Sequence, residues 1–261
     1  MAEPETTSIR PRGLVVYLLP NLLTTAALFA GFYAILAAIR GSFSDASIAI
    51  FVAMVLDGLD GRVARLTHTQ SAFGAEYDSL SDMVAFGLAP SLVMFLWALS
   101  DLGRVGWFAA FVYTAATALR LARFNVQIAV VDKRYFQGLP SPSAAAIPAS
   151  AVWLGSHYGL AGPDLAWPAA ILTVVVGLLM VSNFRYFSFK DLAWHDRVPF
   201  LVAVAIMLGF AVTFLYPAPV LFSLFLVYAV SGPAITWNQR RRKRERRPPS
   251  HRLPLPPDLN R

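Results

Sequence analysis

The segment DGLDGRVARLTHTQSAFGAEYDSLSD, residues 57–82, decides how this chain folds and where its chemistry lies. It sits among long apolar stretches and holds five of the fifteen acidic residues of the chain: Asp57, Asp60, Glu76, Asp78 and Asp82. A carboxylate at the centre of a membrane helix costs about 2.5–3.5 kcal/mol on insertion scales, so such residues usually have a function. The segment therefore predicts a functional site inside a membrane domain.

The composition around this segment is that of a membrane protein. Of the 261 residues, 57% are hydrophobic and only 14% are charged, whereas a soluble domain has about 25% charged residues. A membrane-spanning helix needs about 20 mostly apolar residues. We therefore expect an all-α, polytopic transmembrane helix bundle with eight helices, at residues 16–39, 44–66, 72–99, 104–130, 143–159, 165–183, 198–215 and 217–237.

The basic residues indicate how the chain is oriented. With a cytoplasmic N-terminus, only Arg40 and Arg104 of the 22 Lys and Arg residues fall on the outer side, as the positive-inside rule requires. We expect both termini and the site on the cytoplasmic side of the inner membrane. The membrane domain is expected to span 1–237, and 238–261 to be a disordered, basic, Pro-rich cytoplasmic tail. Its run RRRKRERR, at 240–247, fits an anchor beside anionic lipids better than a nucleic-acid site.

The spacing of the four aspartates predicts a metal site. Asp57 and Asp60 are three residues apart and Asp78 and Asp82 are four apart, so each pair lies on one face of a helix. The short polar link 66–73 makes the two helices antiparallel neighbours. Four carboxylates in a low dielectric repel one another unless cations neutralise them. An all-carboxylate site favours Mg²⁺, Mn²⁺ or Ca²⁺ over zinc.

Two other interpretations of the aspartates stay open. A buried ion-pair network with Arg62 and Arg65 would set two bases against four acids and leave net negative charge. A cation or proton transporter would also carry carboxylates in the membrane, but along a crossing path with polar residues on several helices. Because the membrane acids here lie on two adjacent helices, the pattern favours an enzyme.

The same segment fits the pattern D-x2-D-G-x2-A-R-x8-G-x3-D-x3-D at all eight fixed positions, which include Gly61, Ala64, Arg65 and Gly74. This pattern resembles the signature of the CDP-alcohol phosphotransferase family. The resemblance implies an all-helical membrane fold with a six-helix core, to which the last two predicted helices are an addition. Members of the family are commonly homodimers, so a homodimer is expected.

The resemblance also implies roles for individual residues. Asp57, Asp60, Asp78 and Asp82 would hold two Mg²⁺ or Mn²⁺ ions that bind the pyrophosphate of a CDP-linked lipid. Asp82 would in addition be the catalytic general base on the acceptor hydroxyl. The nucleotide would be contacted by residues of the motif and of the link: Gly61, Ala64, Arg65, Gly74, Thr67 and Ser71.

Three further segments resemble the serine-using branch of the family, the phosphatidylserine synthases: PNLLT at 20–24, LRLARFN at 119–125 and YFQGLPSPSAAA at 135–146. This resemblance implies transfer of a phosphatidyl group from CDP-diacylglycerol to L-serine, with release of CMP. It also makes Asn21 a contact of the nucleotide or of the metal shell. Glycerol 3-phosphate, inositol phosphate and choline remain alternative acceptors, since the family uses them too.

The basic residues near the end of the fourth predicted helix suit anionic substrate groups. Arg120 and Arg123 lie on one helical face, and arginine makes bidentate contacts with oxyanions. We expect them, with Lys133, to bind the lipid phosphate or the serine carboxylate. The structural alternative is that the arginines extend to the inner headgroups as topology markers.

Overall fold

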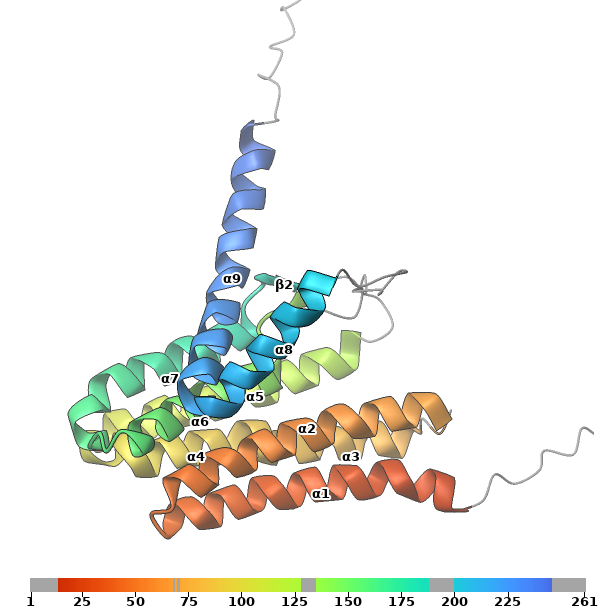
Figure 1. The fold of residues 1–261 in the computed structure, drawn as a ribbon, viewed down its shortest axis with the longest axis horizontal. Coiled ribbons are helices and arrows are strands. Elements are labelled where there is room, and N and C mark those ends of the chain that lie inside the picture. The colour runs from red at the N-terminus through yellow and green to blue at the C-terminus, as the bar shows by residue number, and fades with distance from the viewer. Residues whose placement is uncertain (1–13, 68, 70, 128–134, 188–199, 246–261) are drawn as a thin grey trace, which may run out of the picture.

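The computed structural model describes residues 14–67, 69, 71–127, 135–187 and 200–245. Figure 1 shows α1 to α7 running side by side as a bundle, with α8 and α9 inclined across it. The helices are α1 Leu14–Ile39, α2 Phe43–Thr67, α3 Ala72–Asp82, α4 Ala89–Met94, α5 Arg104–Gln127, α6 Ser141–His157, α7 Ala166–Val181, α8 Phe200–Leu215 and α9 Pro217–Glu245. Two short strands, β1 Tyr135–Gln137 and β2 Arg185–Phe187, pair antiparallel.

The described residues form a polytopic helical membrane protein. Five segments are long and apolar enough to cross a membrane: Leu18–Ile39, Ala72–Leu102, Arg104–Val126, Gly162–Val181 and Pro217–Trp237. The helix α2 has 25 residues, enough to cross a bilayer at 1.5 Å per residue. Its aspartates and arginines, however, lower its apolar character. The helix α6 has 17 residues and α8 has 16, so both are shorter than an average span.

The expected helix boundaries agree with the observed ones to within a few residues, except at the C-terminus. We expected the last membrane helix to end at residue 237 and a tail to follow. Instead, α9 continues to Glu245, because 238–245 consists largely of Arg, Lys, Glu and Gln, which are good helix formers. Residues 246–261 lie outside the described part of the chain. The two strands were not expected either, since three residues carry no readable alternation.

The predicted helix 72–99 is continuous, but it changes geometry directly after Asp82. Residues Met83–Leu88 form a π-helical stretch, and a second one follows α4 at Phe95–Leu99. Pro90, near the start of α4, has no N–H for the carbonyl of Phe86 four residues earlier. That carbonyl accepts a hydrogen bond of 3.1 Å from the buried Tyr113 hydroxyl of α5. The bond ties α5 to the helix that carries the second aspartate pair.

Small residues let α1 approach this helix closely. A Cβ atom at Gly31 would lie 2.7 Å from the Cα atom of Ala85, so only glycine fits at this crossing. Ala30, Ala34 and Ala53 are likewise buried in the core that α1, α2 and α4 share. Such close contacts between small residues are typical of membrane helix packing. They hold α1 and α2 against the helix that continues from α3, on which Asp78 and Asp82 lie.

Candidate active site

Three of the four predicted metal ligands converge between α2 and α3. One carboxylate oxygen from each of Asp57, Asp60 and Asp78 lies within 4.8 Å of the other two. Asp60 is buried and the other two are half-buried. Oδ1 of Asp78 is buried and has no hydrogen-bond partner among the described residues. An oxygen-only set with an unsatisfied carboxylate oxygen fits a hard divalent cation; we call these three residues the acidic trio.

Asp82 lies at the edge of the trio and not within it. Its carboxyl group is within hydrogen-bonding reach of Asp57. It is also within electrostatic range of Arg120 of α5, although the two side chains form no ion pair. Asp82 is the last residue of α3, directly before the π-helical stretch, and such stretches are frequent at functional sites. Asp82 therefore joins the acidic trio to a basic group.

The helix α1 supplies hydroxyl groups that position the aspartate helices. The Thr24 hydroxyl lies 2.6 Å from Oδ2 of Asp60, and the Thr25 hydroxyl lies 2.9 Å from that of Tyr77 on α3. Ser81 donates to the carbonyl oxygen of Thr24 at 3.1 Å. Sequence reasoning missed Thr24, although it ends the PNLLT segment. A threonine hydroxyl inside a membrane helix was the signal that could have identified it.

The hydroxyl groups at the link between α2 and α3 form hydrogen bonds with the backbone of these two helices. Ser71 caps α3 by accepting a hydrogen bond of 3.0 Å from the backbone N–H of Gly74. The Thr67 hydroxyl donates to the carbonyl of Val63 at 2.7 Å. A Cβ atom at Gly74 would lie 3.6 Å from the side-chain oxygen of Asn21, so α1 reaches this turn as well. Contact of these residues with a nucleotide stays a prediction.

The other motif residues lie on the last turns of α2. Gly61 and Arg65 are one turn apart, and a Cβ atom at Gly61 would meet nothing nearer than the Arg65 guanidinium, at 3.8 Å. Arg62 and Arg65 are both exposed, and neither is ion-paired with the aspartates in the described ranges. The alternative of a buried ion-pair network therefore gains no support. Ala64 is half-buried on the same turn as Gly61.

The two arginines of α5 have different environments. Arg120 is largely buried; its Nη1 donates to the Ser141 hydroxyl at 2.7 Å, and its buried Nε has no partner among the described residues. Arg123 donates from Nη2 to the side-chain oxygens of Gln137, at 2.5 Å, and Asn183, at 2.7 Å. Arg120 therefore lies at the site. Arg123 instead links α5 to the last residue of β1 and to the segment after α7. Lys133 lies outside the described residues.

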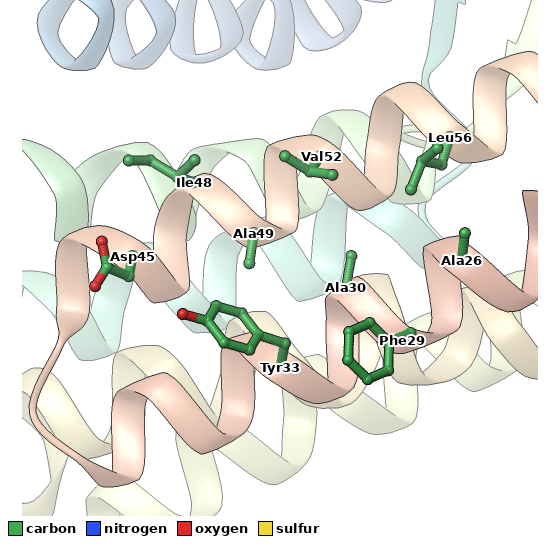
Figure 2. Close-up of a pocket in the computed structure, with 9 residues that line it drawn as sticks. All are labelled: Ala26, Phe29, Ala30, Tyr33, Asp45, Ile48, Ala49, Val52 and Leu56. Carbon is green, nitrogen blue, oxygen red and sulfur yellow. The ribbon is translucent and has the colours of Figure 1, made fainter.

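An apolar groove of about 550 Å³ opens between α1 and α2 (Figure 2). It is lined by Ala26, Phe29, Ala30, Tyr33, Asp45, Ile48, Ala49, Val52 and Leu56. Figure 2 shows Asp45 and the Tyr33 hydroxyl together at one end, whereas Leu56 at the other end directly precedes Asp57 in α2. The groove thus offers a hydrocarbon-lined surface that begins one residue from the acidic trio.

Comparison with known proteins gives a consistent result. A family model described as CDP-alcohol phosphatidyltransferase matches residues 17–215. A CDP-diacylglycerol–serine O-phosphatidyltransferase of Helicobacter pylori is 38% identical over 215 residues, which cover 82% of this chain and 90% of the relative. A protein of the same name from Mycobacterium leprae is 30% identical over 88% of this chain and 78% of its own. An archaetidylserine synthase of Methanothermobacter thermautotrophicus is 35% identical over 64% of this chain and 69% of its own.

Proposed function

Because the chain belongs to the CDP-alcohol phosphatidyltransferase family, we propose that it transfers the phosphatidyl group of CDP-diacylglycerol to the hydroxyl of L-serine and releases CMP. The observation that carries the proposal is the similarity, over 82% of the chain, to a relative named as an enzyme of this reaction. The presence of Arg120 within electrostatic range of Asp82 supports it, because a serine zwitterion needs a cation for its carboxylate near the group that receives its hydroxyl proton.

The acidic trio and Asp82 are the proposed holders of two Mg²⁺ or Mn²⁺ ions. The convergence of the trio and the unsatisfied oxygen of Asp78 support this assignment. Bound cations would neutralise charge on the pyrophosphate and on the departing CMP. Thr24 holds Asp60 in the orientation required, as outer partners of metal ligands commonly do.

In the proposed reaction, Asp82 receives the proton of the serine hydroxyl as its oxygen bonds to the phosphorus of the phosphatidyl group. The bond from that phosphorus to the bridging oxygen of CMP breaks, and CMP leaves with the electron pair. Asp82 needs only to accept a proton from a hydroxyl held in line beside it, so its position matters more than its basicity. Arg120 holds the serine carboxylate.

The groove between α1 and α2 is the proposed place for one acyl chain of the donor lipid. From Leu56 to Asp45 it extends over twelve residues of α2, and the eleven steps between them span about 16 Å at 1.5 Å per residue. That length is comparable to half of a hydrocarbon core of about 30 Å. A chain lying there would leave the pyrophosphate at the acidic trio.

We further propose that the chain crosses the inner membrane eight times, with both termini and the site facing the cytoplasm, and that it forms a homodimer. The small number of basic residues in the expected outer loops supports this orientation. Accessibility of single cysteines in this cysteine-free chain tests it, for example at Gly41 and at Ser71. Labelling of position 71 from outside intact cells would contradict the orientation.

The reaction is tested by measuring CMP release from CDP-diacylglycerol by purified full-length protein. Serine, glycerol 3-phosphate, inositol phosphate and choline are supplied separately, with Mg²⁺ or Mn²⁺ and after chelation. We expect release with serine, its loss after chelation and its recovery when Mn²⁺ or Mg²⁺ is restored. Release with another alcohol alone overturns serine as the acceptor. Full activity after chelation overturns the metal assignment.

A further inference from the structure

The helix α9 lies beyond residues 17–215, which match the family model, yet it is fastened to the bundle close to the site. Tyr186 of β2 is fully buried, and its hydroxyl donates to the carbonyl oxygen of Ala229 at 2.9 Å. A Cβ atom at Gly232 would overlap the Tyr186 ring, so glycine one turn further along α9 makes room for it. Figure 1 shows α9 passing beside β2. This docking fixes the depth and rotation of α9.

The docking brings Tyr228 of α9 within electrostatic range of Arg120. The rings of Tyr186 and Tyr228 lie 5.5 Å apart between centroids. Tyr228 is close enough to Arg120 for phenol and guanidinium to interact electrostatically. Arg120 also donates from Nη1 to the Ser141 hydroxyl, and it is within electrostatic range of the buried Tyr113 and of Asp82. Groups on α3, α5, α6 and α9 thus interact with this guanidinium.

We propose that α9 forms part of the acceptor site and that Tyr228 is a positioning residue, which holds the Arg120 guanidinium beside Asp82 to bind the carboxylate of an amino-acid acceptor. The inference rests on the proposed function. It adds that a helix outside the matched family domain contributes to acceptor affinity. The buried Nε of Arg120, which has no partner among the described residues, leaves a donor for that carboxylate.

The test compares Tyr228→Phe with Tyr216→Phe in the full-length protein. Tyr216 lies at the turn before α9 and is 59% exposed, so it controls for loss of a tyrosine hydroxyl on the same helical hairpin. The apparent KM for serine, the KM for CDP-diacylglycerol, kcat and the thermal unfolding midpoint are measured for each. For Tyr228→Phe we expect the serine KM to rise about 10-fold, because the phenol hydroxyl within electrostatic range of the Arg120 guanidinium is lost. The other three quantities are expected to stay unchanged, and Tyr216→Phe to resemble the wild type.

A merely structural role of Tyr228 predicts a different result. It would lower the unfolding midpoint, or change kcat and both KM values together, and either outcome overturns the inference. An unchanged serine KM overturns it as well. If the wild type uses only an acceptor without a carboxylate group, this inference and the serine assignment are overturned, while the family reaction stands. If no acceptor supports CMP release, the proposed function and this inference fall together.

Discussion

The Thr24 hydroxyl of α1 lies 2.6 Å from Oδ2 of Asp60 on α2, with both residues buried. The carbonyl oxygen of the same threonine accepts a hydrogen bond of 3.1 Å from Ser81 on α3. One residue of α1 is therefore bonded to both helices that carry the aspartates. The relative positions of Asp60 and Asp78 then depend on α1 as well as on the link between their own helices.

Replacement of Thr24 by valine should weaken cation binding. Valine keeps the shape of threonine but removes the hydroxyl that orients Asp60, and loss of such an outer partner typically reduces metal affinity by about 10–100-fold. We expect the Mn²⁺ or Mg²⁺ concentration for half-maximal CMP release to rise by about tenfold or more. Activity at saturating metal should largely recover. The measurement is a metal titration at fixed substrate concentrations.

Two variants serve as controls for Thr24. Thr24→Ser retains the hydroxyl and should restore the metal requirement. Thr173→Val removes another buried threonine hydroxyl, which lies on α7 and donates to the carbonyl of Ala169 in its own helix. This variant should leave the titration unchanged. A Thr24→Val protein with the wild-type metal requirement would contradict the role assigned to the bond.

Gly61→Ala should change the binding of CDP-diacylglycerol without lowering the stability of the protein. A Cβ atom at Gly61 would meet only the Arg65 guanidinium, at 3.8 Å, so alanine fits and should raise helix stability by up to about 1 kcal/mol. If the nucleotide packs against Gly61, the methyl group will raise the KM for CDP-diacylglycerol. We expect a higher KM with an unchanged or higher unfolding midpoint.

Gly58→Ala is the matched control on the same helix. A Cβ atom there would meet nothing within 4 Å, and Gly58 is not a fixed position of the signature pattern. We expect a similar gain in stability and a normal KM for CDP-diacylglycerol. Equal KM values in the wild type and in Gly61→Ala would remove Gly61 from the nucleotide site.

The sequence predicted those features of the fold that depend on local pattern. The helix ends follow from the lengths of the apolar stretches, and convergence of Asp57, Asp60 and Asp78 follows from their spacing and a short link. The π-helical change after Asp82 was not predictable, because it accompanies Pro90 and a tertiary hydrogen bond from Tyr113. No periodicity in the sequence encodes such a bond.

The separate roles of the two arginines were also beyond the sequence. Arg120 and Arg123 share a helical face, and we expected both to bind substrate groups. The partners of Arg123 come from the segments after α5 and after α7, namely Gln137 and Asn183, whose approach depends on the pairing of β1 with β2. Three-residue strands leave no signal in a sequence, so the structural role of Arg123 could not be predicted.

Arg123→Ala should therefore affect mainly the stability of the protein, and Arg120→Ala mainly the KM for serine. Arg123→Ala removes the hydrogen bonds to Gln137, Asn183 and the carbonyl of Val181. The bonds to Gln137 and Asn183 are exposed to solvent, so their loss is only a modest one, and the free energy of unfolding should fall by about 1–2 kcal/mol. The serine KM should change little. Arg120→Ala should instead raise the serine KM by at least about tenfold. Thermal unfolding in detergent and steady-state kinetics measure the two effects. Identical profiles of the two variants would contradict the division of roles.

Asp82→Asn tests the assignment of the general base. Asparagine keeps the size of the side chain and its contact with Asp57, but it cannot accept the serine proton. General-base contributions are typically about 10²–10⁴-fold, so kcat should fall by that factor. The donor should still bind, because the acidic trio remains intact. Binding of CDP-diacylglycerol is measured directly, for example by its protection of the protein against thermal unfolding.

The matched variants distinguish a base from a plain metal ligand. Asp78→Asn removes a member of the trio, and it should weaken both donor binding and metal activation. Asp101→Asn, at an exposed residue of the turn before α5, should be neutral. If Asp82→Asn raises the metal requirement as Asp78→Asn does and its kcat recovers at saturating metal, Asp82 acts only as a ligand, and the serine proton must go to another group. Normal turnover of Asp82→Asn would remove Asp82 from the mechanism.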